Sequence, residues 1–431
     1  MRNILIVGAG QAGLQLALSL KAEGHQVTLM SARTPAEIRD GGPTSTQAMF
    51  DPALELERAY GLNHWDQAAP PIHGLHVMLA APPGNLALQF TAPLDRPAYS
   101  TDQRIKFAQW LTEAEQAGVE VVYQPVSLSY LEALTPRYDL TIVAAGRGDL
   151  VAAFDRDPER SPYAEPQRAL AVAYVHGLAP DPAWPEPHVE FHAIPGLGEL
   201  FVIPSLTKSG PCDILFWEAI PGGPLDVFEG QPAESPQPTE NPRPTENPRP
   251  TENPRPAEDH LEIMLGLIKE NLPWFAERCG DVTLTDEQAT ITGRLTPAVR
   301  KPVAHLPGGG IALGIGDIVI SNDPITGQGA NTAAKAAAHY LQAILANGDK
   351  PFDEEWMTAT FESFWAAHGQ AVTLWTNGML QPLPPHAQQI LGAASASQTV
   401  ARRFAHGFED PNDLLTWFAD PQAAETYLGS V

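Results

Sequence analysis

The chain of 431 residues is 43% hydrophobic, which is enough for a sizeable buried core divided among two or three domains. Its formal net charge of -25 repels phosphate backbones and anionic surfaces, so we expect no nucleic acid or membrane partner. The only two cysteines, Cys212 and Cys279, belong to no CxxC motif or His/Cys cluster, which argues against a disulfide framework and a metal site. No signal-peptide core or membrane-spanning run occurs, so we expect a cytoplasmic protein.

The N-terminus carries a dinucleotide-binding pattern. Residues 3–7 predict a strand, GAGQAG follows at residues 8–13, and a helix over 14–23 leads to a second strand over 25–30. In this βαβ context the glycines permit a tight turn, close approach of a pyrophosphate and close helix packing. The alternative is a turn that only packs a strand on a helix. Ser31 stands where an acidic residue normally grips the ribose, so we expect a loose hold on the cofactor.

The next segments suggest a pocket wall and further cofactor contacts. Residues 44–49 look extended, which would project Ser45, Gln47 and Met49 from one face, because strand side chains alternate. A helix should begin near Thr101 or Asp102 with Arg104 in its first turn. We predict strands over 119–126 and 139–144, the second ending at Ala145-Gly146.

The middle of the chain predicts a second layer. The segments ALAVAYVHG, HVEFHAI, LFVIPSL and ILFWEAI, between residues 169 and 219, favour an antiparallel sheet that would cover the ring end of the cofactor. Three tandem TENPRP repeats then occupy residues 239–256 within a proline-rich stretch, 230–257, which we interpret as a disordered surface insertion. A docking ligand for a partner is the alternative. Helices are predicted over 259–271 and from residue 352 onward.

Residues 311–336 contain a second glycine pattern, which is read together with the one at the N-terminus. A strand over 311–315 runs into Gly316-Asp317, where a carboxylate can accept hydrogen bonds from the hydroxyls of a sugar alcohol. Gly327-x-Gly329 opens a helix of small residues, whose free N–H groups and dipole can face an electron-rich ring edge. The two glycine patterns together indicate a flavoprotein.

These motifs resemble those of the flavin-dependent aromatic monooxygenases of the p-hydroxybenzoate hydroxylase fold. The strings SPYAEPQRALAVAYVHG, YDLTIVAAG, GDIVISNDPITGQGAN and TLWTN are similar to the oxygenase component of styrene and indole monooxygenases. The resemblance implies an α/β fold with a Rossmann-like FAD-binding domain, a β-sheet substrate domain and C-terminal helices. We assign residues 1–160 and 285–345 to the FAD domain, with 42–100 contributing to the substrate pocket, 161–284 to the substrate domain and 346–431 to the helical region.

The resemblance also implies the source of electrons. The Asp-Gly motif of single-component hydroxylases is missing, since VAAGR stands at residues 143–147, and no second GxGxxG lies between a strand and a helix. We therefore expect FADH2 from a separate NADH-dependent flavin reductase. Its reaction with O2 would give a flavin C4a-hydroperoxide that epoxidises an alkene, without a catalytic acid or base from the protein. Expected cofactor contacts are Gly8, Gly10, Gln11, Ala12, Gly13, Ser31, Arg33, Arg104, Val126, Gly146, Asp317, Pro324, Gly327, Gly329, Ala330 and Asn331.

The substrate positions resemble the indole-preferring branch. They are Ser45, Gln47, Met49, Ile72, Leu75 and Ala98, with Leu75 a mild departure from an expected isoleucine. Ser45 and Gln47 could pair with an indole N–H, or bond only to the backbone. We predict epoxidation of indole, leading to indoxyl and indigo, and of styrene-like alkenes. Alternatives are a styrene-preferring epoxidase, a flavin-dependent dehydrogenase or reductase, and a non-catalytic binding protein; the oligomeric state is open, a homodimer included.

Overall fold

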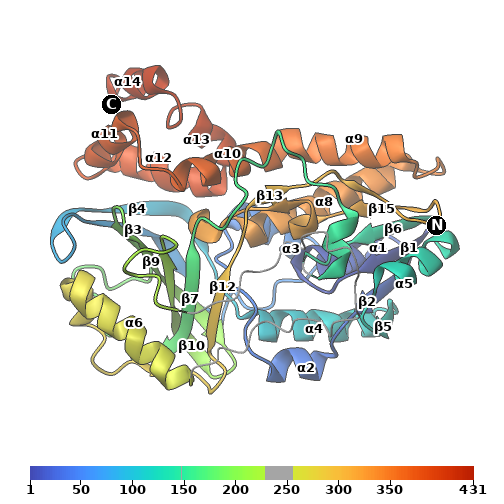
Figure 1. Cartoon of the computed structure of the whole chain (residues 1–431), viewed down its shortest axis with the longest axis horizontal. Helices are drawn as coiled ribbons and strands as arrows, with labels where there is room; N and C mark the ends of the chain where they lie inside the picture. The colour runs from blue at the N-terminus through green and yellow to red at the C-terminus, as the bar shows by residue number, and fades with distance from the viewer. Residues whose placement is uncertain (147, 229–255) are drawn as a thin grey trace.

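The computed structural model describes residues 1–146, 148–228 and 256–431. Two sheets lie side by side, and a row of C-terminal helices runs along one edge of both (Figure 1). The predicted proline-rich insertion lies almost wholly outside the described residues, as does Arg147. No helix within the described ranges is long and apolar enough to cross a membrane.

The first sheet is the predicted dinucleotide-binding layer. Its strands, in spatial order, are β14 (Val303–His305), β15 (Ile311–Gly314), β6 (Leu140–Val143), β1 (Asn3–Val7), β2 (Gln26–Ser31) and β5 (Glu120–Tyr123). All neighbours are parallel except the pair β14 and β15, which forms a hairpin around residues 308–310. The central strands β1, β6 and β2 are buried along nearly their whole length.

Helices α1 (Gln11–Ala22), α4 (Gln103–Gln116) and α8 (Gly329–Asn347) cover this sheet. Every residue of α1 from Gln11 to Leu20 is buried, because α4 and α8 both pack against it. Asp102 caps α4 by accepting from the Arg104 backbone N–H, as the sequence predicts. Shorter helices nearby are α2 (Pro35–Asp40), α3 (Asp51–Arg58) and α5 (Leu128–Leu134), with 3-10 turns η1 (Thr135–Arg137) and η2 (Asp149–Ala153).

The second sheet runs in the order β11-β7-β10-β9-β8-β3-β4, with β12 also paired to β7. Its strands are β3 (Ile72–Ala80), β4 (Leu86–Ala98), β7 (Ala169–His176), β8 (Val189–Ile194), β9 (Gly198–Thr207), β10 (Gly210–Ala219), β11 (Thr283–Leu284) and β12 (Thr290–Arg294). The four strands β7 to β10 form the predicted antiparallel layer. The sequence did not predict β3 and β4, where Pro93 and Pro97 obscure the strand pattern.

Alternation divides this sheet into two faces. Leu215 and Trp217 of β10 point toward α6 (Ala257–Asn271), and they share an apolar cluster with Met264 and Ile268. Ile214 and Phe216 belong to a different cluster on the opposite face. We call this opposite face the inner face, because it lies against segments of the first sheet's layer.

The C-terminal region is helical, as predicted. It comprises α9 (Glu354–Phe364), the π-turn η5 (Trp365–Gly369), α10 (Gln370–Met379), α11 (Pro385–Ala394), α12 (Gln398–Glu409), α13 (Pro411–Leu415) and α14 (Pro421–Leu428). The aromatic residues Phe361, Phe364 and Trp365 are buried in the first sheet's cluster, and α12 packs on β4. Short connecting elements are α7 (Pro273–Ala276), β13 (Ala298–Val299), β16 (Ile320–Ser321), η3 (Gly316–Ile318) and η4 (Pro324–Thr326).

One secondary-structure prediction is wrong. Residues 44–48 form no strand, and Met49 makes only an isolated bridge to Tyr99, with N···O distances of 2.8 and 3.0 Å in the two directions. A strand needs a neighbour along its whole length, and this segment pairs only through the Met49–Tyr99 bridge. The strand predicted over residues 44–49 therefore reflects local composition and not pairing with a neighbour.

Candidate functional site

The parallel strands of the first sheet end at one edge. Val7 is in register with Met30 and with Val143, and Val143 is in register with Gly314. The loops that follow these strands therefore emerge together, and in such sheets ligands bind in the crevice beyond the carboxyl ends. The predicted contacts at this edge are Gly8, Ser31, Val126, Gly146 and Asp317.

The N-terminal turn has the geometry that a pyrophosphate requires. Gly8 has φ +119° and donates its N–H to the Met30 carbonyl at 3.0 Å. A Cβ on Gly13 would lie 2.0 Å from the Gly8 carbonyl oxygen, so this glycine permits the close packing of α1. In contrast, a Cβ on Gly10 would meet no protein atom within 4 Å, and Gly10 caps α1 without a side-chain hydrogen bond. The N-terminus of α1 is thus open to an anionic group.

Two segments that lie far apart in the chain meet beside this turn. A Cβ on Gly146 would lie 2.6 Å from Cβ of Asp317, so these residues pack backbone against side chain. Gly316 has φ +71°, and a Cβ there would lie 3.4 Å from the Ala12 methyl group. The Gly316-Asp317 motif is therefore held against α1, close to where a dinucleotide would bind.

Ser31, at the end of β2, is buried and bonded locally. Its Oγ donates to the Arg33 carbonyl at 2.6 Å and accepts from the Arg33 N–H at 3.3 Å. No carboxylate takes the position of the usual ribose ligand on β2. The loose hold that the sequence suggests stays a prediction. Val126 follows β5 and packs, half-buried, against the first sheet's core.

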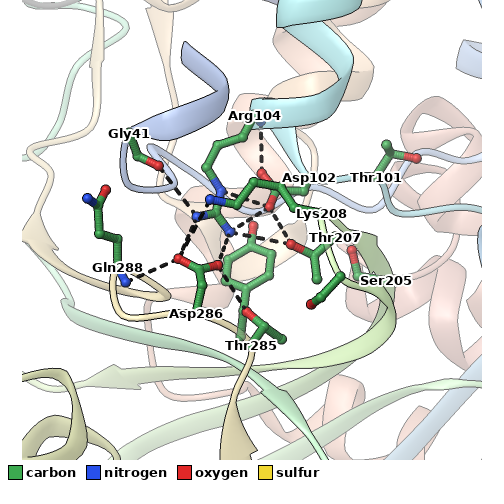
Figure 2. Close-up of polar contacts among 12 residues, drawn as sticks. Gly41, Thr101, Asp102, Arg104, Ser205, Thr207, Lys208, Thr285, Asp286 and Gln288 are labelled. Atoms are coloured by element: carbon green, nitrogen blue, oxygen red, sulfur yellow. Dashed lines mark hydrogen bonds and ion pairs between the residues drawn. The ribbon is translucent and has the colours of Figure 1, made fainter. Parts of the chain in front are cut away.

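Arg104 lies in a closed polar network instead of pointing to an open edge. Figure 2 shows its guanidinium between Asp102 and Asp286, with N···O distances of 2.8 and 3.0 Å. It also donates to the carbonyl of Gly41 and to Oγ1 of Thr207, both at 3.4 Å. The side chain is 2% exposed and its donors are committed within the protein. We therefore assign Arg104 to bracing α4 against the second sheet, and not to direct cofactor contact.

The segment 324–331 forms a turn followed by a helix, as expected for a ring-edge contact. Gly327 adopts the left-handed conformation, with φ +63°, between η4 and α8. No side chain caps the start of α8, and a Cβ on Gly327 or Gly329 would meet nothing within 4 Å. The hydroxyl groups of Thr326 and Thr376, 2.7 Å apart, tie this turn to the TLWTN motif on α10. The start of α8 therefore has no side-chain cap, while the Gly327 N–H donates to the Pro324 carbonyl at 2.7 Å.

Asn331 joins this turn to the predicted substrate segment. Its Oδ1 accepts from the Phe50 N–H at 2.9 Å, and its Nδ2 donates to the carbonyls of Ala48, at 2.9 Å, and Gly327, at 3.1 Å. Asn331 is 1% exposed, so these bonds are shielded from water. Residues 48–50 are thereby fixed against the start of α8, beside Ala330.

The three residues expected on one strand face lie in different surroundings. Ser45 is exposed, and its Oγ donates to the Thr46 carbonyl at 3.1 Å. Gln47 is buried; its Nε2 donates to the Thr101 carbonyl at 2.7 Å, while its Oε1 has no partner among the described residues. Met49 is buried, and its sulfur lies 3.0 Å from Nζ of Lys106. The prediction that all three share a face is wrong, because the segment is not a strand.

The remaining substrate positions fall into two groups. Ile72 and Ala98 are paired across β3 and β4, and they belong to the inner-face cluster with Ala48 and Phe50. Leu75 packs instead in the cluster formed with the C-terminal helices. A register irregularity between Ile72 and Gly74 accompanies this change of side. The structure thus gathers Ile72 and Ala98 in one apolar cluster with Ala48, the neighbour of Gln47 in the chain, but leaves Leu75 outside it.

The sequence did not predict a buried ion pair that lies behind the site. Nζ of Lys106 contacts Oε1 of Glu57, and the two side chains are 2% and 1% exposed. Gln11, at the start of α1, donates to the same carboxylate oxygen at 2.8 Å. This pair links the dinucleotide turn to Met49, which contacts the same ammonium group. The available signal was a lysine within the otherwise apolar face of α4, four residues before the buried Trp110.

Comparisons with known proteins agree with this geometry. A family profile described as "Styrene monooxygenase A putative substrate binding domain" matches residues 146–278. The chain is 30% identical over 98% of its length to styrene monooxygenase StyA of a Pseudomonas species, and 29% identical over 98% to StyA of Pseudomonas fluorescens; it covers 96% of each. Its fold is similar to that of the halogenase PltM L111Y mutant in complex with FAD, with a TM-score of 0.60, 13% identity and coverage of 100% of this chain and 86% of that one. The predicted fold class and use of FAD are confirmed, and the chain belongs to the styrene monooxygenase family.

Proposed function

We propose that the protein is the oxygenase component of a two-component monooxygenase, which receives reduced FAD from a separate NADH-dependent reductase and epoxidises indole and styrene-like alkenes. The observation that carries the proposal is Asn331, which fixes residues 48–50 against the open N-terminus of α8. With O2, bound reduced flavin supplies an electrophilic oxygen. The chain's own task is to hold the alkene beside the ring and to exclude water.

The nucleotide sites support the proposal of an outside electron donor. Among the described residues, one glycine turn, residues 8–13, joins a parallel strand to a helix. The other glycine-rich segment, residues 308–310, turns between the antiparallel strands β14 and β15. The fold therefore offers a nicotinamide cofactor no second Rossmann-type site within these ranges.

We expect the isolated protein with FAD and NADH to oxidise NADH at a negligible rate. Addition of any reductase that releases free reduced flavin should start epoxide formation, because only FADH2 delivery is missing. NADH absorbance and product chromatography, measured with and without the reductase, check this expectation. NADH turnover by the isolated chain would instead support a flavin-dependent dehydrogenase or reductase.

Gln47 supports indole as the substrate. Its buried Oε1 has no partner within the described part of the chain, and the next residue, Ala48, belongs to the apolar cluster that contains Ile72 and Ala98. An indole N–H could donate to this oxygen, and a buried donor left unpaired costs about 1–3 kcal/mol. Styrene has no such donor, so a styrene-preferring site would gain nothing from this acceptor.

Replacing Gln47 with valine should lower the indole-to-styrene ratio of kcat/KM by roughly five-fold, since one hydrogen bond of about 1 kcal/mol is lost. Ser45→Asn is the matched control, because Ser45 is exposed, and it should leave the ratio unchanged. Competition assays with both substrates measure the effect. An equal loss for both substrates would show that Gln47 supports the fold or the cofactor, and a styrene-preferring epoxidase would become the better description.

A further inference from the structure

Two carboxyl groups meet where the second sheet touches the Pro324–Gly327 turn. Glu218 lies near the end of β10, on the inner face in line with Phe216, and is 0% exposed. Asp323 immediately precedes η4 and is 2% exposed. The carboxyl groups lie within hydrogen-bonding reach of each other. Such an arrangement cannot hold two anions without a large cost.

The neighbouring charges do not neutralise this pair. The charge of Arg168 acts on both carboxyl groups, and its guanidinium makes a two-point contact with Glu199, at 2.8 and 3.0 Å. Glu199 stands directly opposite Glu218 in the β9–β10 register, so it adds a third negative charge to the same face. The cluster therefore contains three carboxyl groups and one committed guanidinium.

The hydrogen bonds of the two carboxyl groups indicate that one of the groups carries a proton. Oδ1 of Asp323 accepts from the Ile325 N–H at 3.2 Å. Its Oδ2 and both oxygens of Glu218 receive no hydrogen bond from any residue that the structure describes. A proton on one carboxyl group would supply the missing donor and would remove one of the facing charges.

We propose that Glu218 and Asp323 share one proton at neutral pH, and that this protonated pair positions the Pro324–Gly327 turn against the second sheet. The role in catalysis rests on the proposed function, which places this turn beside the flavin ring. Asp323 caps η4, so a displacement of its carboxyl group would shift Pro324 directly. The two acids are positioning residues, since neither is placed against substrate.

The electrostatics of the cluster agree with the geometry. Burial raises the pKa of Asp323 to about 7, against the opposing effects of the Ile325 N–H and Arg168. Burial, followed by the charges of Asp323 and Glu199, raises the pKa of Glu218 well above its ordinary value. In the unfolded chain both groups lose their protons near pH 4.

These two raised pKa values determine how the stability of the folded protein depends on pH. Between about pH 4 and 7 the folded protein holds a proton that the unfolded chain has lost, so this pair makes the folded state less stable as pH rises. Glu218→Gln replaces the shared proton by an amide donor, which lets Asp323 ionise at a lower pH. Asp323→Asn does the same for Glu218, while its Oδ1 can still accept from Ile325.

The test compares the melting temperatures of the wild type, Glu218→Gln, Asp323→Asn and a control, Glu262→Gln, from pH 5 to pH 8. Glu262 is exposed on α6, so its variant should follow the wild type. The melting temperature of either pair variant should rise relative to the wild type by roughly 3 °C across this range. A parallel course for both variants, or failure of both to fold, would overturn the proposal.

A second readout concerns the turn itself. With reduced FAD supplied, the epoxide formed per flavin oxidised should decline in the wild type as the pair loses its proton above pH 7, and it should stay level in Glu218→Gln. An equal decline in both proteins would contradict the positioning role. If the wild type forms no epoxide at any pH, the proposed function fails, while the melting temperatures still decide whether the pair holds a proton.

Discussion

Replacing Gly13 with alanine should both destabilise the protein and abolish flavin binding. The new Cβ would lie 2.0 Å from the Gly8 carbonyl oxygen and 3.1 Å from its carbon, so the turn and α1 must separate. Such overpacking against backbone costs about 1–3 kcal/mol or more. Thermal unfolding and titration with FAD, followed by fluorescence, measure the two losses. Retention of normal FAD affinity would show that this turn does not bind the dinucleotide.

Gly10→Ala separates binding from folding. The protein leaves open space beside Gly10, and its φ of -96° suits any residue, so the variant should keep the wild-type melting temperature. A methyl group there would nevertheless occupy the position of the approaching pyrophosphate, and FAD affinity should fall at least ten-fold, on the order of 1.4 kcal/mol. Gly266→Ala, in open space on α6, is the control that should affect neither binding nor folding adversely. Unchanged FAD affinity in Gly10→Ala would place the pyrophosphate elsewhere.

Removing the ammonium group of Lys106 should be among the most destabilising single changes in the first domain. Lys106→Met leaves the Glu57 carboxylate buried with Gln11 as its remaining donor, and breaking such a pair costs about 3–5 kcal/mol. The double variant Lys106→Met with Glu57→Leu removes both charges, and it should recover most of the lost stability. Urea unfolding of the two single variants and the double variant measures the coupling.

The recovery of the double variant decides between two roles of this pair. A buried ion pair often contributes little compared with apolar residues of similar volume, so recovery would mark Lys106 and Glu57 as a purely structural pair. The salt bridge of Arg402 with Asp95 provides a control: both side chains are more than half exposed, so Arg402→Met should change stability by less than about 1 kcal/mol. Additive losses from Lys106→Met and Glu57→Leu would contradict direct coupling.

Several features of the fold follow from local sequence. The strand at residues 3–7 and the cap at Asp102 lie where the sequence places them, because both depend on neighbours within a few residues. The glycines at 8, 13 and 316 were recognisable because only a residue without a side chain permits their backbone conformation or close packing.

Other assignments depended on partners that are distant in the chain. Residues 44–49 have a strand-like composition, but only Met49 pairs with another segment, through its bridge to Tyr99. Arg104 was correctly placed in the first turn of α4, yet its partner Asp286 is 182 residues away, and the ion pair turns the side chain from the expected cofactor contact. No periodicity in the sequence indicates that these two residues form an ion pair.

The sequence by itself indicated an FAD-binding α/β fold with a second glycine turn and a β-rich layer, because short motifs encode each of these features. Only the tertiary structure decided which polar atoms remain unpaired. Oε1 of Gln47, Oδ2 of Asp323 and both carboxyl oxygens of Glu218 receive no hydrogen bond from the described residues, because the assembled fold buries them. Burial and hydrogen-bond satisfaction are properties of the assembled fold, and they select the residues that can recognise a substrate or hold a proton.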